Sequence, residues 1–307
     1  MLKLFKSIKV YKMQALGLGL LRWVLIGGIC YIIIFPVLSK LSSSFMTIPD
    51  IFDKTVMWIP RNLTLDNYRF AFAEMEYPQA FINTLVLTLT ISIFQLLACT
   101  LIGYGFGRFN FWGKQLFFAL VIFTLIVPPQ MIMIPLYLNF KNFNPLGLLP
   151  GGGINLLGSF WPFILTALSG TGLRNGLFIY IMRQFFKGMS RSLEEAAYVD
   201  GAGPLRTFFQ IMLPGATPAL IIVFLFSFVW QWNDYFFTNI FMGSGSQLLP
   251  IMLNDLIYQI DPSLRTTAYA SIINNTGSLL FMAPLLLLYA VLQRYFVESI
   301  ERTGLVG

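Results

Sequence analysis

The hydrophobic positions of this chain gather into long stretches instead of alternating with polar ones. A helix needs about 20 apolar residues to cross the hydrocarbon core of a membrane, which is about 30 Å thick. Six stretches come close to this length or exceed it, over residues 22–39, 80–105, 115–138, 159–186, 216–242 and 272–292. The pattern predicts an all-α integral membrane protein with six transmembrane helices.

Prolines interrupt most of these stretches. Those that punctuate the later ones include Pro128 and Pro129 in the third, Pro162 in the fourth, Pro218 in the fifth and Pro284 in the sixth. Each proline removes a backbone donor from a helix. We therefore expect kinks or broken helices, in which neighbouring helices or cavity water satisfy the freed carbonyl groups.

Charge is scarce, and its distribution predicts an orientation. Hydrophobic residues make up 57% of the sequence and charged residues 11%, whereas a soluble domain has about 25% charged residues. If the N-terminus is inside the cell, thirteen of the 20 Lys and Arg residues fall in inner segments and six in outer ones. Inner loops of membrane proteins are rich in Lys and Arg, so we expect both termini on the cytoplasmic side. No soluble basic face remains to bind nucleic acid.

This topology divides the chain into segments. Residues 1–21 form a cytoplasmic N-terminal segment, residues 22–299 the membrane domain and residues 300–307 a cytoplasmic tail. Within the membrane domain, residues 40–79 form an extracytoplasmic connection and residues 187–214 a cytoplasmic loop. The first apolar stretch is too long for a cleaved signal peptide and lacks a cleavage pattern after it, so we expect a signal anchor.

The sequence offers little chemistry of its own. Cys30 and Cys99 lie in apolar stretches, which is typical of small buried side chains and not of a disulfide framework. Histidine is absent, which removes the commonest general base and metal ligand. The GxxxxGK[ST] pattern of a phosphate-binding loop is also missing. We therefore expect no catalytic residue, no metal site and no cofactor bound by this chain.

The cytoplasmic loop of residues 187–214 begins with the pattern of a short helix. Ser192 and Glu195 have the spacing of a capping box, in which each side chain satisfies a free backbone donor at the helix start. Asp200 and Gly201 predict the end of this helix, because glycine tolerates the left-handed conformation that often stops one.

A second short helix is expected to follow. Pro204 suits its first turn, where a missing donor costs nothing. Leu205, Phe208, Phe209 and Met212 then recur at helical spacing and predict one apolar face. Such a face favours either an amphipathic segment on the lipid surface or a plug for a cleft on a cytoplasmic partner.

The same loop resembles the EAA loop of ABC importer permeases. The matching residues are Glu195-Ala196-Ala197, Gly201, Ile211 and Leu213-Pro214. The resemblance implies that the loop, with Asp200 at its hinge, seats in a cleft of an ATPase subunit and couples ATP hydrolysis to transport.

The rest of the chain is similar to carbohydrate importers of this family, in particular to the shorter permease of the maltose-type transporters. The segments that carry this similarity are residues 65–68, 127–130, 178–186, 230–235 and 293–297. It implies the type I ABC importer permease fold in the cytoplasmic membrane of a bacterium. It also implies a second homologous permease subunit, two ATPase subunits that bind ATP and Mg, and an extracytoplasmic solute-binding protein. The tail of residues 301–307 would contact the ATPases, although Val306 stands where relatives often have lysine.

Polar side chains within the membrane mark a candidate substrate path. Arg174 falls inside the fourth span, where an ionisable side chain is expensive and is by default functional. Asp234 in the fifth span is a possible partner for it, and both structural pairing and substrate contact stay open.

Aromatic and amide side chains extend this candidate path. Trp230, Trp232, Asn233 and Tyr235 combine flat apolar faces with hydrogen-bonding groups, which suits sugar recognition, interfacial anchoring or helix packing. Weaker candidates are Asn83, Gln95, Asn274 and Asn275, because amides also join helices.

Two other functions remain open. One is an ABC permease for a non-sugar solute, since such permeases also carry EAA loops. The other is a secondary transporter that needs no ATPase, for which we would expect inverted repeats or a midplane ion site.

Overall fold

A computed structural model describes residues 2–149 and 153–304 of the chain, with side chains described from residue 17 to 291 and at 293. The described backbone is helical apart from isolated bridges and loops. The fold contains two compact units: residues up to Glu74 with Leu256–Leu280, and Met75–Asp255 with the chain from Phe281 onward. The predicted contact of residues 301–307 with ATPases concerns side chains outside the described part.

The first unit joins the N-terminal helix to the start of the C-terminal one. Its elements are α1 (Leu2–Ser44), α2 (Ile48–Phe52), α3 (Asp66–Glu74), η3 (Leu256–Gln259) and the start of α15 (Ala268–Gly304). Lys40 donates to the Asn275 Oδ1 at 2.7 Å, which links α1 to α15. The buried Asn67 amide donates to the carbonyl oxygens of Ser44 and Met46, both at 2.9 Å. The Asn67 bonds fix the start of α3 to the end of α1.

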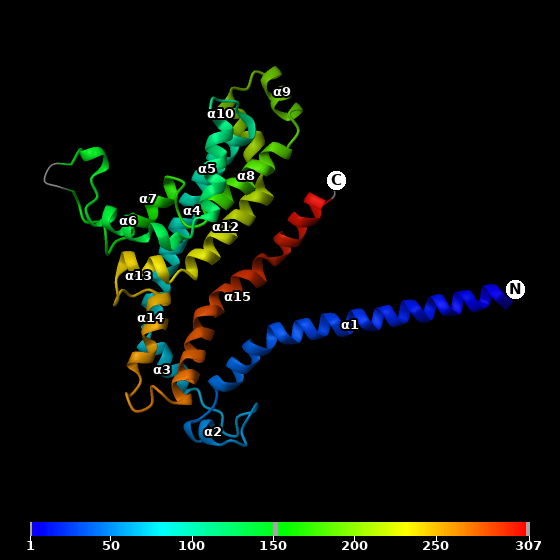
Figure 1. The fold of residues 1–307 in the computed structure, drawn as a ribbon, viewed down its shortest axis with the longest axis vertical. Helices are drawn as coiled ribbons and strands as arrows, with labels where there is room; N and C mark the ends of the chain where they lie inside the picture. The colour runs from blue at the N-terminus through cyan, green and yellow to red at the C-terminus, as the bar shows by residue number, and fades with distance from the viewer. Residues whose placement is uncertain (1, 150–152, 305–307) are drawn as a thin grey trace. The chain divides into compact units, whose positions relative to one another are not determined.

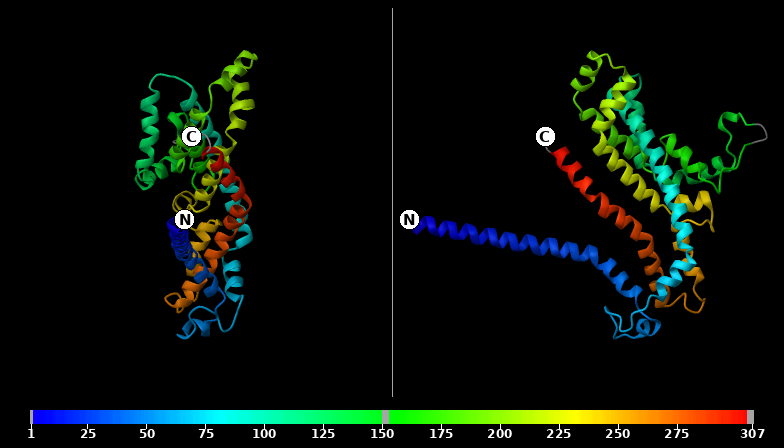
Figure 2. Two further views of the ribbon diagram at one scale, coloured as in Figure 1. Left: turned by 90° about the vertical axis from the view of Figure 1, so that its right-hand side faces the viewer. Right: turned by 180° about the vertical axis from the view of Figure 1, so that it is seen from behind.

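The second unit holds most of the remaining helices. They are α4 (Tyr77–Arg108), α5 (Lys114–Ile126), α6 (Pro129–Lys141), η1 (Pro145–Gly147), α7 (Trp161–Leu168), α8 (Asn175–Gly188), α9 (Ser192–Val199), α10 (Pro204–Thr207), η2 (Phe208–Met212), α11 (Leu213–Gly215), α12 (Thr217–Trp232), α13 (Phe236–Met242) and α14 (Leu249–Asp255). Figures 1 and 2 show α4 lying along both α8 and α12.

The contact between α4 and α8 depends on two glycines. A Cβ atom at Gly103 would lie 2.5 Å from the Met182 Cβ, and one at Gly107 would lie 3.0 Å from the Phe186 Cβ. The two glycines stand four residues apart, which is the small-residue spacing that lets membrane helices approach closely. Phe178, Met182 and Phe186 of α8 are fully buried as a result.

Three predicted spans are broken helices. The third bends by 102° between α5 and α6, where Pro128 and Pro129 remove two backbone donors. The fourth stops after Leu168 and restarts at Asn175, and the fifth stops at Trp232 and restarts at Phe236. The prolines predicted only the first of these breaks at its correct position.

Several described helices have the length and composition to cross a membrane. Three single helices meet both criteria: Gly17–Ser44, Tyr77–Arg108 and Ala268–Val291. If each of two bent helix pairs is counted as one span, the number rises to five. The second pair, Pro204–Gly215 with Thr217–Trp232, bends by 74°. The six-span count and the orientation from charge stay predictions.

Candidate functional site

The hinge of the 187–214 loop has the predicted glycine stop. Gly201 takes a φ of 79°, which a side chain with a Cβ adopts at a cost. Its N–H donates to the Tyr198 oxygen at 3.1 Å, and the Ala202 N–H donates to the Ala197 oxygen at 2.9 Å. This pair of bonds defines a Schellman end for α9, so the expected stop at Asp200 and Gly201 is confirmed.

The predicted capping box at the start of α9 is wrong. Ser192 is the first helical residue and not the cap, and its hydroxyl bonds to the Ser190 hydroxyl at 2.7 Å. The Ser190 hydroxyl accepts the Ser192 N–H at 3.3 Å. The free backbone N–H at the helix start is therefore satisfied by Ser190, two residues earlier, and not by Ser192. The Glu195 side chain is exposed and makes no hydrogen bond within the described part of the chain.

Glu194, the neighbour of the motif glutamate, anchors the loop to α4. Tyr104 donates to the Glu194 Oε1 at 3.0 Å, and Arg108 forms an ion pair with the Oε2 at 3.5 Å. The side chains of Arg108 and Glu194 are only 5% and 14% exposed. Arg108 also donates to the Met189 oxygen at 2.8 Å. Sequence reasoning missed this anchor, although an arginine at the end of an apolar span was a usable signal.

The second loop helix begins at Pro204 as predicted, but its apolar stripe divides between two faces. Phe208 and Met212 are 5% and 0% exposed and join the core. Leu205 and Phe209 are 75% and 59% exposed. The reason is that the pairs 205/209 and 208/212 follow separate rows along the helix, and residues 208–212 form the π-helical turn η2.

Five exposed apolar side chains therefore stand on the two loop helices, and we call them the loop surface. They are Leu193, Tyr198, Val199, Leu205 and Phe209. Of the motif residues, Ala197 is buried, Ile211 and Leu213 are partly buried, and Glu195, Ala196, Asp200, Gly201 and Pro214 are exposed. An exposed apolar group on a small helical element is typical of an interaction site.

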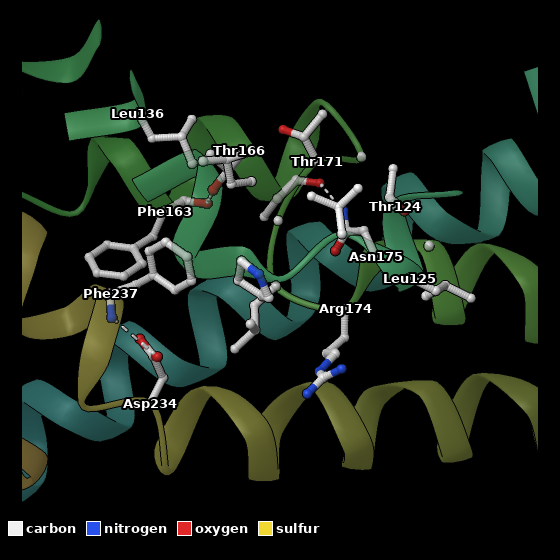
Figure 3. Close-up of a pocket in the computed structure, with 18 of the residues that line it drawn as sticks. Thr124, Leu125, Leu136, Phe163, Thr166, Thr171, Arg174, Asn175, Asp234 and Phe237 are labelled. Carbon is white, nitrogen blue, oxygen red and sulfur yellow. Dashed lines mark hydrogen bonds between the residues drawn. The ribbon is translucent and has the colours of Figure 1, made fainter. Parts of the chain in front are cut away.

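A cavity of about 590 Å³ lies where the three broken helices meet, lined by residues of all three breaks. Its walls come from Val127 and Pro128 between α5 and α6, from residues 170–174 between α7 and α8, and from Asp234 between α12 and α13. Figure 3 shows the polar side chains among the apolar ones. Ligand sites are commonly concave, mostly apolar and furnished with a few polar groups in this way.

Arg174 lies in the second break and not inside a helix. It takes a left-handed φ of 62°, uncommon for a residue other than glycine. Its guanidinium stands 5.5 Å from the centre of the Trp230 ring, within the range of a cation–π contact. The Trp230 ring also stacks against the rings of Phe178 and Phe226.

Asp234 lines the same cavity but does not pair with Arg174. Its carboxylate accepts the N–H groups of Phe237 and Thr238 at 3.3 and 3.0 Å and the Thr238 hydroxyl at 3.1 Å. It therefore caps the start of α13. Within the described residues no acidic side chain forms an ion pair with Arg174.

The remaining candidates lie elsewhere. Trp232 is fully buried and donates from its indole to the Phe281 oxygen at 3.2 Å, so it is a packing residue. Asn233 and Tyr235 are exposed beside the third break and do not line the cavity. Asn83 donates to the Gln247 oxygen at 2.9 Å, and Asn274 is an exposed residue of the other unit.

Two glutamines matter more than the sequence indicated. Gln95 donates to the Leu173 oxygen at 2.6 Å and bonds with Asn175 and Ser227, which ties α4, α8 and α12 behind the cavity. Gln231 is not among the candidates that the sequence indicated, yet it lines the cavity. It is 6% exposed, and its Nε2 has no hydrogen-bond partner within the described part of the chain.

Comparison with known proteins gives a consistent result. The family described as "Binding-protein-dependent transport system inner membrane component" matches residues 99–302. An arabinooligosaccharide transport system permease of Halalkalibacterium halodurans is 28% identical, over 94% of this chain and 98% of the relative. A galactooligosaccharide transport system permease of Bacillus subtilis is 26% identical, over 94% and 95%.

A solved structure shares the fold. It is the crystal structure of a bacterial ABC transporter involved in the import of the acidic polysaccharide alginate, with a TM-score of 0.73 and 23% identity. The match covers 91% of this chain and 96% of that one. The resemblance drawn from the sequence is thereby confirmed at the level of family and fold.

Proposed function

Because the chain belongs to the family of binding-protein-dependent transport system inner membrane components, we propose that it forms half of the path of an ATP-driven oligosaccharide importer. It works in the cytoplasmic membrane of a bacterium with a second permease, two ATPase subunits and an extracytoplasmic solute-binding protein. The chain itself is a transport subunit and not an enzyme, since ATP and Mg bind to the ATPase partners.

The loop surface is the observation that carries this proposal. Leu205 and Val199 are 75% and 87% exposed at the hinged loop, and water contact with such side chains is unfavourable. A cleft on an ATPase subunit would cover them. The Schellman end of α9 and the Glu194 anchor would let the loop pass a movement of the ATPase to α4.

Co-purification tests this partnership. The tagged chain is expressed with its partners, and the amount of ATPase that travels with it is measured. We expect Leu205→Asp to lower the ATPase yield at least about tenfold, because a carboxylate replaces an apolar contact at the interface. Leu146→Asp is the matched control, since Leu146 is 94% exposed but lies outside the loop. Failure of any ATPase to travel with the wild type would favour a secondary transporter.

The oligosaccharide substrate is supported by the named relatives, which transport arabinooligosaccharides and galactooligosaccharides. Uptake of labelled solutes into cells that express the whole system checks it. We expect uptake of oligosaccharides and none of amino acids. Uptake of amino acids alone would identify a permease for a non-sugar solute.

A further inference from the structure

The cavity at the three helix breaks is lined by an arginine that forms no ion pair among the described residues. Arg174 and Asp234 are the charged side chains among its lining residues. Asp234 is engaged by three donors at the start of α13, whereas the Arg174 guanidinium lies 5.5 Å from the centre of the Trp230 ring and forms no ion pair among the described residues. The N–H groups of the Arg174 guanidinium therefore have no carboxylate partner among the described residues.

Gln231 adds a second free donor to the same wall. It is 6% exposed, and its Nε2 lacks a partner in the described part of the chain. A buried donor without a partner costs free energy and calls for an explanation. Gln231 comes from the end of α12 and Arg174 from the break before α8, and both residues line the one cavity.

The backbone reinforces the positive character of this wall. α6 begins at Pro129 and α8 at Asn175, and both residues line the cavity. Helix N-termini carry a partial positive charge. Arg174 also pays backbone strain at a φ of 62°, and residues held in such conformations cluster at ligand sites. Figure 3 shows its side chain extending from the loop toward α12.

We propose that Arg174 and Gln231 form an anion subsite of the translocation path and that the imported oligosaccharide carries carboxylate groups, as uronic acids do. A planar guanidinium binds a carboxylate through two parallel hydrogen bonds. The Trp230 ring lies beside the guanidinium, and the Gln231 amide supplies a further donor. This inference rests on the proposed function, because it names the substrate class of that same path.

Direct binding to the purified permease–ATPase complex tests the subsite without the binding protein. The probes are trigalacturonate and its carboxyl-reduced counterpart, which differ only in the carboxylate groups. We expect the wild type to bind the carboxylated probe at least about tenfold more tightly, as one charge-assisted hydrogen bond predicts. Equal affinity for the two probes, or no binding of either, would overturn the proposal.

Three variants locate the effect. Arg174→Gln is expected to remove the preference, while affinity for the neutral probe changes less than about twofold. Arg174→Lys should retain part of the preference, because it keeps the charge but loses the planar fork. Gln231→Glu should weaken binding of the carboxylated probe alone. Arg69→Gln is the control, since Arg69 lies in the other unit and is 79% exposed.

The comparison between probes separates a local role from a general defect. A variant that loses both probes equally is misfolded or structurally altered, and a preference that survives Arg174→Gln refutes the subsite. The proposed function fails in a different way, by absence of the ATPase from the purified complex. A complex that contains the ATPase and binds both probes equally refutes the anion subsite alone.

Discussion

Two adjacent glutamates, Glu194 and Glu195, have different surroundings in this chain. Glu194 is 14% exposed and paired with Arg108, whereas Glu195 beside it is exposed. A helix rotates successive side chains by about 100°, so only one of two neighbours can face α4. The sequence motif pointed to Glu195, and the structure adds Glu194 as the anchor.

The hinge glycine makes a prediction at the residue scale. Gly201→Val should strain the left-handed backbone by about 1–3 kcal/mol and misplace α9 against α10. We expect sugar uptake to fall while ATP hydrolysis continues, measured as ATP consumed per sugar transported in proteoliposomes of the whole complex.

Gly203→Val is the matched control for the hinge. Gly203 has a φ of −76° and open space around its Cα, so valine fits there without backbone strain. Full coupled uptake by Gly201→Val would show that the hinge conformation is not needed.

At the scale of elements, the loop helices gain their position from α4. Tyr104 and Arg108 at its end bind Glu194, while Gly103 and Gly107 on the same helix admit α8. The spacing of these glycines was readable from the sequence. The sequence did not show which helix these glycines would face, because that depends on the rotation of α4 in the folded unit.

The ion pair between Glu194 and Arg108 predicts that replacing Glu194 and replacing Glu195 have different effects. Glu194→Ala leaves the Arg108 charge buried without its carboxylate and should cost about 2–3 kcal/mol of stability. Thermal unfolding of the purified complex measures this. Glu195→Ala should leave the unfolding temperature unchanged and instead weaken association with the ATPase. Equal melting temperatures for the two variants would contradict the assigned anchor.

At the scale of the whole molecule, the charge distribution predicts an orientation. Trp112 and Leu146 are 92% and 94% exposed and fall in connections predicted inside and outside the cell. In a chain whose own cysteines are replaced, a membrane-impermeant thiol reagent should label Leu146→Cys in intact cells. It should label Trp112→Cys only after permeabilisation. The reverse pattern would show that the chain has the opposite orientation in the membrane.

The sequence by itself determined that the chain has membrane-spanning stretches, the family to which it belongs and the hinge of the 187–214 loop. Apolar stretches long enough to cross a membrane follow from hydropathy alone, and the hinge at Gly201 follows from local backbone preference. Both are properties of short windows of the chain. The prolines likewise predicted the break between α5 and α6.

Only the tertiary structure decided the site. Arg174 and Trp230 are 56 positions apart in the sequence, and no local pattern places them in contact. Arg174 and Asp234 lie in two of the helix breaks and not in regular helix, and both line the one cavity. Trp232, similar in sequence context to Trp230, is fully buried and bonds to the Phe281 oxygen, because two residues along a helix differ by about 200° in direction.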